Sequence, residues 1–311
     1  MLSRTATALY WIGRYVERAE FTAQLVEATL RLDSLAARPA GSDAWASALA
    51  VASAGDSFAL SGLPQGASGI AHHLLLSPDN PSSIRSCIEL ARQNARAVRT
   101  ALSREAWLSV NRAWIELGNH RQVNDTKDIL ALVEEIKAQA RGFEGALHRM
   151  LRNEAQFMVA LGAAIERANG TARLLDVKYH LLLPAGERVG GAVDRDQWTG
   201  ILRTVSAVTA YRWLYREGLK PWLVAELLVL REELPRSLVA CVEQVMLLLT
   251  RLSQRTGQQG EADRLARRLR ADLRGLTGEQ LIQQGMHEML TRFIEEFGAL
   301  DRAISQQFRF G

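Results

Sequence analysis

Apolar residues along this 311-residue chain recur every three or four positions, the spacing that places them on one face of an α-helix. One such stripe consists of Ile84, Ile88, Ala91, Ala95, Val98 and Leu102. No proline occurs between Ser82 and Leu183, and this segment is rich in the good helix formers Ala, Leu, Arg and Glu. Strand-like alternation of any length is missing from the sequence. The pattern therefore predicts an all-α fold.

The chain also resembles itself, which indicates an internal duplication. Residues 11–27 align with residues 160–176, and seven of these seventeen positions are identical. Further matches follow in the same order at nearly constant spacing: Trp45 with Trp198, Pro81 with Pro235, Cys87 with Cys241, and Gly145 with Gly298. Landmarks of this kind predict two tandem units, residues 1–155 and 156–311. Because no clear linker separates them, we expect the units to pack as one pseudo-symmetric helical bundle body.

Composition narrows the classes of function. Apolar residues make up 48% and charged residues 23% of the chain, as in an ordinary globular protein. A formal net charge of +4 is too small and too dispersed to indicate nucleic-acid binding. The most apolar stretch, residues 238–249, is interrupted by Glu243 and is too short to span a bilayer. The first residues lack a signal-peptide pattern. We therefore expect a cytoplasmic protein with no nucleic-acid or membrane partner.

Residue patterns for metal, cofactor or covalent chemistry are not found in the sequence. The adjacent His72 and His73 point apart on a helix, and neither Cys87 nor Cys241 has metal-ligand spacing. Glycine-rich phosphate loops and nucleophile-elbow motifs are also missing. The sequence therefore predicts no metal and no cofactor.

A Glu-Arg pair occurs once in each unit, at Glu17-Arg18 and at Glu166-Arg167. Arg14 lies on the same face as the first pair, among aromatic and aliphatic residues that favour burial. Since an unpaired buried charge costs several kcal/mol, these groups need partners. One hypothesis is structural: the pairs, Glu166 and Arg167 among them, lock helices together. The other is that arginines of the first unit hold a carboxylate or phosphate.

The first unit is the better candidate for a specialised site. Its Trp11, Arg14, Tyr15 and Glu20 are replaced in the second unit by Ala160, Ala163, Ala164 and Asn169. Its predicted helix after residues 79–83 carries a row of arginines where residues 245–250 are mostly apolar. Cap residues and Pro81 predict the start of that helix. The candidate ligand-binding residues are Arg14, Glu17, Arg18, Asn80, Ser82, Ser83, Arg92, Asn94, Arg96 and Arg99. A solvated helix face is the alternative explanation for the arginine row.

The segments MLSRTATALYWIGRYVERAE, NPSSIRSC, ARQNAR and ALGAAIERANGTARLLDVKY resemble the bacterial alpha-E family, a helical family named for its Glu-Arg motif. The resemblance covers essentially the whole chain. Members tend to be encoded beside a circularly permuted ATP-grasp ligase and a transglutaminase-like cysteine peptidase. The resemblance therefore implies these two enzymes as partners in an amide- or peptide-bond-forming system. Gln93 stands where the family has an acidic residue, which argues against a carboxylate at that position.

Three functions stay open at this point. The chain is an accessory or partner component that binds an anionic peptide-like or carboxylate ligand, or the ligase itself. Alternatively, it is an enzyme in which Glu17 acts as acid or base and arginines stabilise negative charge. The third hypothesis is a purely structural helical scaffold.

Overall fold

The computed structural model describes residues 1–35, 41–123, 125–180, 191–257, 259–277, 281 and 285–310. Helices dominate these ranges, which contain no strand, so the predicted all-α fold is confirmed. None of the helices in the same ranges is both long enough and apolar enough to cross a bilayer. The chain forms two compact units. The first consists of Met1–Glu166 together with Phe308–Gly311, and the second consists of Arg167–Gln307. The boundary between them falls inside the helix α8 (Glu154–His180), whose first turn contains the predicted repeat seam.

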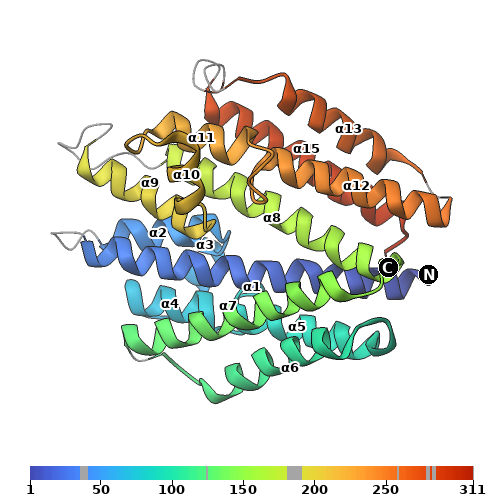
Figure 1. Cartoon of the computed structure of the whole chain (residues 1–311). Coiled ribbons are helices and arrows are strands. Elements are labelled where there is room, and N and C mark those ends of the chain that lie inside the picture. The colour runs from blue at the N-terminus through green and yellow to red at the C-terminus, as the bar shows by residue number, and fades with distance from the viewer. Residues whose placement is uncertain are drawn as a thin grey trace. The chain divides into compact units, whose positions relative to one another are not determined.

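The first unit is built on four long helices. Its elements before α8 are α1 (Ser3–Leu35), α2 (Gly41–Val51), α3 (Gly55–Leu60), α4 (Ala67–Leu75), α5 (Ile84–Ala97), a 3₁₀ turn (Arg99–Ala101), α6 (Arg104–Asn119) and α7 (Thr126–Arg149). α1 contacts α5 and α7, and α6 contacts the same two helices (Figure 1). The short helices α2 and α4 also contact α1. α1 is therefore the central helix of this unit.

The sequence of α1 explains its central place. Leu9, Tyr10, Leu25 and Val26 point in different directions around the helix, and each is at most 5% exposed. A helix that is apolar on every side is stable only when other elements cover it completely. α1 therefore carries its polar residues into the interior as well.

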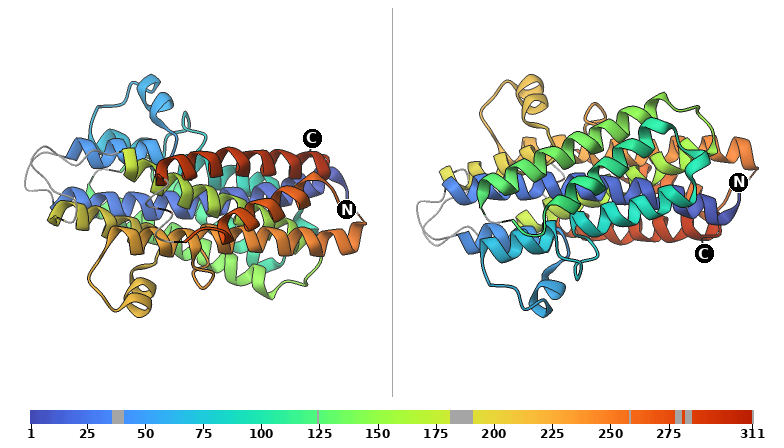
Figure 2. Two further views of the ribbon diagram at one scale, coloured as in Figure 1. Left: turned by 90° about the horizontal axis from the view of Figure 1, so that it is seen from above. Right: turned by 90° about the horizontal axis from the view of Figure 1, so that it is seen from below.

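The second unit repeats the order of elements found in the first. After the rest of α8 it contains α9 (Ala192–Thr204), α10 (Val208–Tyr215), α11 (Pro221–Leu230), α12 (Leu238–Thr256), α13 (Glu261–Arg274) and α15 (Met286–Gln307). α13 contacts α12 and α15, as α6 contacts α5 and α7. Figure 2 shows α3, in blue, standing out from the long helices of its unit, and α10, in gold, doing the same in the other. The duplication stays a prediction, with which this order agrees.

Aligned positions also have similar local structures. The Ser83 hydroxyl caps α5 by accepting a hydrogen bond from the Ser86 amide, at 3.1 Å. The Ser237 hydroxyl caps α12 in the same way, accepting from the Ala240 amide at 3.1 Å. The helix start predicted after residues 79–83 is thus confirmed, although Pro81 lies in the preceding turn and not in the first helical turn. A Ser cap satisfies one of the backbone amides that a helix start leaves unpaired.

Two aligned acidic residues make side-chain contacts within their own units. Glu27 of α1 accepts a hydrogen bond from Lys137 of α7 at 2.6 Å. Asp176 of α8 lies 2.9 Å from Nδ1 of His287 in α15. In each unit an acidic residue thus connects the helix of the Glu-Arg pair to the last long helix.

Gly13 and Gly162 lie where α1 and the first part of α8 cross. A Cβ atom on Gly13 would lie 2.0 Å from the carbonyl oxygen of Val159. A Cβ atom on Gly162 would lie 2.0 Å from the carbonyl oxygen of Tyr10. The two backbones are therefore too close for any side chain at either position.

We predict that Gly13→Ala destabilises the protein, because the added methyl group must push two backbones apart; overpacking of this kind costs about 3 kcal/mol. The control is Gly145→Ala in α7, where an added Cβ meets nothing within 4 Å. This variant should be more stable than the wild type by roughly 0.5–1 kcal/mol, since alanine favours helix over glycine. Urea unfolding measures both changes. Equal stability of the two variants would contradict the close crossing.

Candidate functional site

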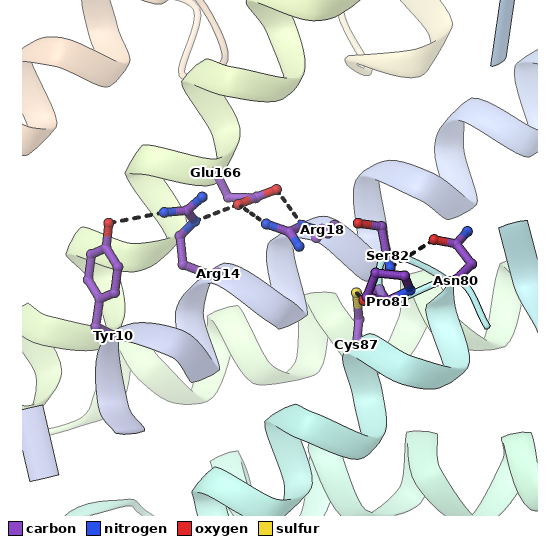
Figure 3. Close-up of polar contacts among 8 residues, drawn as sticks. All are labelled: Tyr10, Arg14, Arg18, Asn80, Pro81, Ser82, Cys87 and Glu166. Carbon is purple, nitrogen blue, oxygen red and sulfur yellow. Dashed lines mark hydrogen bonds and ion pairs between the residues drawn. The ribbon is translucent and has the colours of Figure 1, made fainter. Parts of the chain in front are cut away.

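A buried carboxylate from α8 lies between two arginines of α1. Arg18 donates to Glu166 twice, from Nε to Oε1 at 2.7 Å and from Nη2 to Oε2 at 3.0 Å (Figure 3). Arg14 donates from Nε to Oε2 of the same carboxylate at 2.5 Å. Glu166 is 8% exposed and Arg14 is 6% exposed. The two arginines are one helical turn apart, so both reach the same carboxylate.

This arrangement keeps all three groups charged at neutral pH. Burial alone would raise the pKa of Glu166, but the guanidinium groups of Arg14 and Arg18 outweigh it and lower that pKa to about 2. Burial would likewise lower the pKa of Arg18, yet the adjacent Glu166 carboxylate raises it. Arg14 also donates to the Tyr10 hydroxyl at 3.2 Å and lies 5.3 Å from the centre of the Trp11 ring. The cluster has two positive charges and one negative charge, and the guanidinium group of Arg14 lies beside the aromatic rings of Tyr10 and Trp11.

The Glu-Arg pairs take part in this cluster unequally. Glu166 is the carboxylate at its centre, and Arg18 is one of its two partners. Glu17 is 5% exposed, and Arg167 is half-buried in α8. Arg14 and Arg18, both candidate ligand residues, are therefore already occupied by an internal carboxylate.

Cys87 of α5 lies close enough to Arg18 and Glu166 to interact with them electrostatically. Burial raises the pKa of its thiol to about 12, although the positive charge of Arg18 acts in the opposite direction. Its sulfur lies 3.9 Å from the carbonyl oxygen of Pro81. Cys87 is thus a neutral buried thiol at physiological pH and is not activated as a nucleophile.

The polar residues before α5 mostly bond to one another. Asn80 is 1% exposed; its amide nitrogen donates to the carbonyl of His73 at 3.1 Å. Its side-chain oxygen accepts from the amide of Ser82 at 2.9 Å, as Figure 3 shows. The Ser83 amide donates to the Asn80 carbonyl at 3.0 Å. These groups hold the turn and the helix start, so the amides of Ser82 and Ser83 are not free for an anion.

A buried histidine, His73, lies outside the predicted set. It is completely buried, and its Nε2 lies 2.9 Å from the hydroxyl of Ser57. The Ser57 hydroxyl donates to the carbonyl of Ala54 at 3.1 Å, so its hydrogen does not point to the imidazole. Burial lowers the pKa of His73 and favours its neutral form. The contact is therefore structural. Within the described ranges, no three His, Cys, Asp or Glu side chains gather in a way that could hold a metal ion.

The arginine row of α5 stacks on tryptophans of α6. The Arg92 guanidinium carbon lies 3.8 Å from the ring centre of Trp114 and 5.9 Å from that of Trp107. Its Nε donates to the side-chain oxygen of Asn111 at 2.9 Å. Arg99 lies 5.1 Å from the ring centre of Trp107. Trp114, Arg92, Trp107 and Arg99 thus alternate in an Arg–Trp ladder.

The other two residues of that row lie beside this ladder. Arg96 is exposed and Asn94 is half-buried. The predicted ligand-binding residues do not include Trp107, Asn111 and Trp114, although the spacing of these three places them on one face of α6. That spacing alone does not show that the face is directed at the arginines of α5.

Comparison with protein families identifies the fold group. The family Alpha-E, described as a predicted alpha-helical domain with a conserved ER motif, matches residues 1–308. The chain belongs to the Alpha-E family. No curated protein and no solved structure matches it. In this Alpha-E chain, the glutamate of the second Glu-Arg pair and the arginine of the first meet in one buried ion pair.

We predict that Glu166→Gln destabilises this Alpha-E protein by roughly 3–5 kcal/mol, because it removes the buried negative charge to which Arg14 and Arg18 both donate. The control is Glu217→Gln, which removes an exposed ion pair with Lys220. Such pairs contribute at most about 1 kcal/mol. Chemical denaturation measures both free energies of unfolding. If the two variants lose the same stability, the Glu166 cluster does not hold the fold.

The same cluster predicts an acid-dependent loss of stability. The folded-state pKa of Glu166, about 2, lies below the value near 4.3 expected in the unfolded chain. Its contribution is therefore complete above about pH 4.5 and is lost as the pH falls towards 2. The difference corresponds to about 3 kcal/mol. Unfolding curves at pH 6, 4 and 3 should show a steeper decline for the wild type than for Glu166→Gln. Parallel declines would contradict the prediction.

Proposed function

We propose that this Alpha-E chain is an accessory component of an ATP-dependent amide- or peptide-bond-forming system and holds a carboxylate-bearing ligand for the ligase. The resemblance to a family encoded beside ATP-grasp ligases and transglutaminase-like peptidases supports the choice of system. The arginines of α5 and α6 support the choice of ligand.

The observation that carries the proposal is a group of arginines without carboxylate partners. What we call the basic face consists of Arg92 and Arg96 of α5, Arg99 of the following 3₁₀ turn, and Arg104 of α6. Arg96, Arg99 and Arg104 are exposed. No carboxylate of the described residues forms an ion pair with any of the four. Uncompensated guanidinium groups on one surface favour an anionic ligand, and their planar shape suits a carboxylate.

The second unit provides an internal comparison, because several arginines of α13 form ion pairs within that unit. Arg270 of α13 pairs with Glu243 of α12, and Arg274 pairs with Glu232 at 2.9 Å. Arg264 pairs with Glu261 of its own helix. The positions in α12 that correspond to the arginine row, residues 245–250, are mostly apolar. Glu89 of α5, which aligns with Glu243, forms no ion pair with the basic face in the part of the chain that the structure describes.

The enzymatic alternative receives less support from the geometry. Glu17 is 5% exposed, so a substrate has little access to its carboxylate. Arg14 and Arg18, which would stabilise negative charge developing near Glu17, are bonded to Glu166. Binding at the basic face requires no such access.

The proposal predicts a complex with the ATP-grasp ligase in which Arg92 and Arg96 take part. The double variant Arg92→Ala/Arg96→Ala should weaken ligase stimulation or binding at least tenfold, since each lost contact to an anion is worth on the order of 1 kcal/mol. The measurements are sedimentation of the complex and the rate at which the ligase turns over ATP. The control is Arg264→Ala/Arg268→Ala on α13, where both side chains are 71% exposed.

The control variant should behave as the wild type in both measurements. If the ligase neither binds the wild-type chain nor changes its ATP turnover in its presence, with and without nucleotide, the proposed function is wrong.

A further inference from the structure

We propose that the ligand of the basic face is an extended acidic peptide, whose alternate carboxylates bind along the Arg–Trp ladder. This inference rests on the proposed function for the choice of a carboxylate ligand. It adds the length, the conformation and the charge pattern that the ligand must have.

Arg92 of the ladder has nitrogen atoms that can still bind a ligand. Nε of Arg92 is used by Asn111, and its terminal Nη groups make no hydrogen bond within the part of the chain that the structure describes. Those groups form the edge of the guanidinium that binds a carboxylate with two parallel hydrogen bonds. The flat face of the same group lies against Trp114 at 3.8 Å. Arg92 is thus held by its face and by Nε, while its binding edge is unused.

The tryptophans of the ladder favour an anionic ligand over nucleic-acid bases. Stacking fixes Arg92 and Arg99 before a ligand arrives, so less side-chain entropy is lost on binding. Guanidinium groups already lie over the rings of Trp107 and Trp114. Single-stranded nucleic acids bind mainly by stacking bases on free aromatic faces. Rings occupied by arginine favour recognition of anionic groups over stacking of bases, and the chain's small net charge of +4 agrees.

The spacing of the arginines along α5 bears on the conformation of the ligand. A helix rises about 1.5 Å per residue, so Arg92 and Arg96, which both lie in α5, are about 6 Å apart along the axis. An extended peptide presents side chains on one side every ~6.8 Å, two residues at about 3.4 Å each. The exposed side chain of Arg96, which lies beside the ladder, absorbs the small difference. A peptide with acidic residues at alternate positions therefore matches the spacing of Arg92 and Arg96.

The affinity of the basic face depends on how many carboxylates a ligand carries. An exposed ion pair is worth only about 0.2–1 kcal/mol, so a single small carboxylate binds weakly. A peptide that engages several arginines at once adds such contacts without repeating the full entropic cost of association. The interaction should also weaken as salt screens exposed charges. The surface therefore discriminates a polyanionic peptide from free amino acids.

The experiment uses the full chain and hexa-L-glutamate as the probe. Binding is followed by tryptophan fluorescence and by calorimetry at 50 and 300 mM NaCl. We expect saturable binding that weakens at least tenfold at the higher salt. Hexa-L-glutamine, and free glutamate at the same carboxylate concentration, should bind at least tenfold more weakly than hexa-L-glutamate. Equal binding of hexa-L-glutamate and free glutamate would overturn the inference.

Variants locate the site. Arg92→Ala/Arg99→Ala should weaken hexa-L-glutamate binding at least tenfold, whereas Arg264→Ala/Arg268→Ala should leave it unchanged. Arg92→Lys keeps the charge but loses the planar fork, so it should bind more weakly than the wild type. Circular dichroism confirms that each variant is folded. Unchanged affinity in the folded ladder variant would overturn the inference, as would tighter binding of six-residue oligothymidylate than of hexa-L-glutamate.

Failure of this inference is distinguishable from failure of the proposed function. If hexa-L-glutamate binds at the ladder while the ligase forms no complex, the ligand is correct and the accessory role is wrong. If the ligase complex depends on Arg92 and Arg96 while hexa-L-glutamate does not bind, the accessory role stands and the acidic peptide is wrong.

Discussion

The ion pairs of Glu166 with Arg14 and Arg18 are the interaction on which the first unit depends. Gly13 and Gly162 allow α1 and the start of α8 to cross with their backbones in contact. This crossing encloses the Glu166 carboxylate, which must then be neutralised, because an unpaired interior charge costs several kcal/mol. Two guanidinium groups satisfy it with three hydrogen bonds. The glycines and the charges are therefore parts of one arrangement, in which close packing creates the electrostatic requirement.

The same residue type has opposite roles in two places of this unit. Arg14 and Arg18 are enclosed with a carboxylate and serve the fold. The guanidinium groups of Arg92 and Arg99 lie over tryptophan rings, and neither group forms an ion pair with a carboxylate of the described residues. Stacking fixes the position of a cation without neutralising it, whereas an ion pair does both. This difference moves the functional interest from the Glu-Arg pairs to the ladder on α5 and α6.

The asymmetry between the units is consistent with a division of labour. Arg14 has alanine at its aligned position in the second unit, and the structure shows it bound to Glu166. Its presence in one unit only is thus explained by an internal partner and not by a ligand. The basic face differs from Arg270 and Arg274 of α13, which have acidic partners. Loss of such partners at one surface is what a binding role requires.

The sequence by itself determined the helical class and the start of α5 at Ser83. These follow from periodicity and capping, which depend on residues three or four positions apart. It also marked Arg14, Arg18 and Arg92 as polar groups that need partners. Only the tertiary structure decided which partners they have. Glu166 lies far from Arg18 in sequence, and Trp114 is on a separate helix from Arg92. Both contacts therefore depend on how the helices pack, which no local sequence pattern encodes.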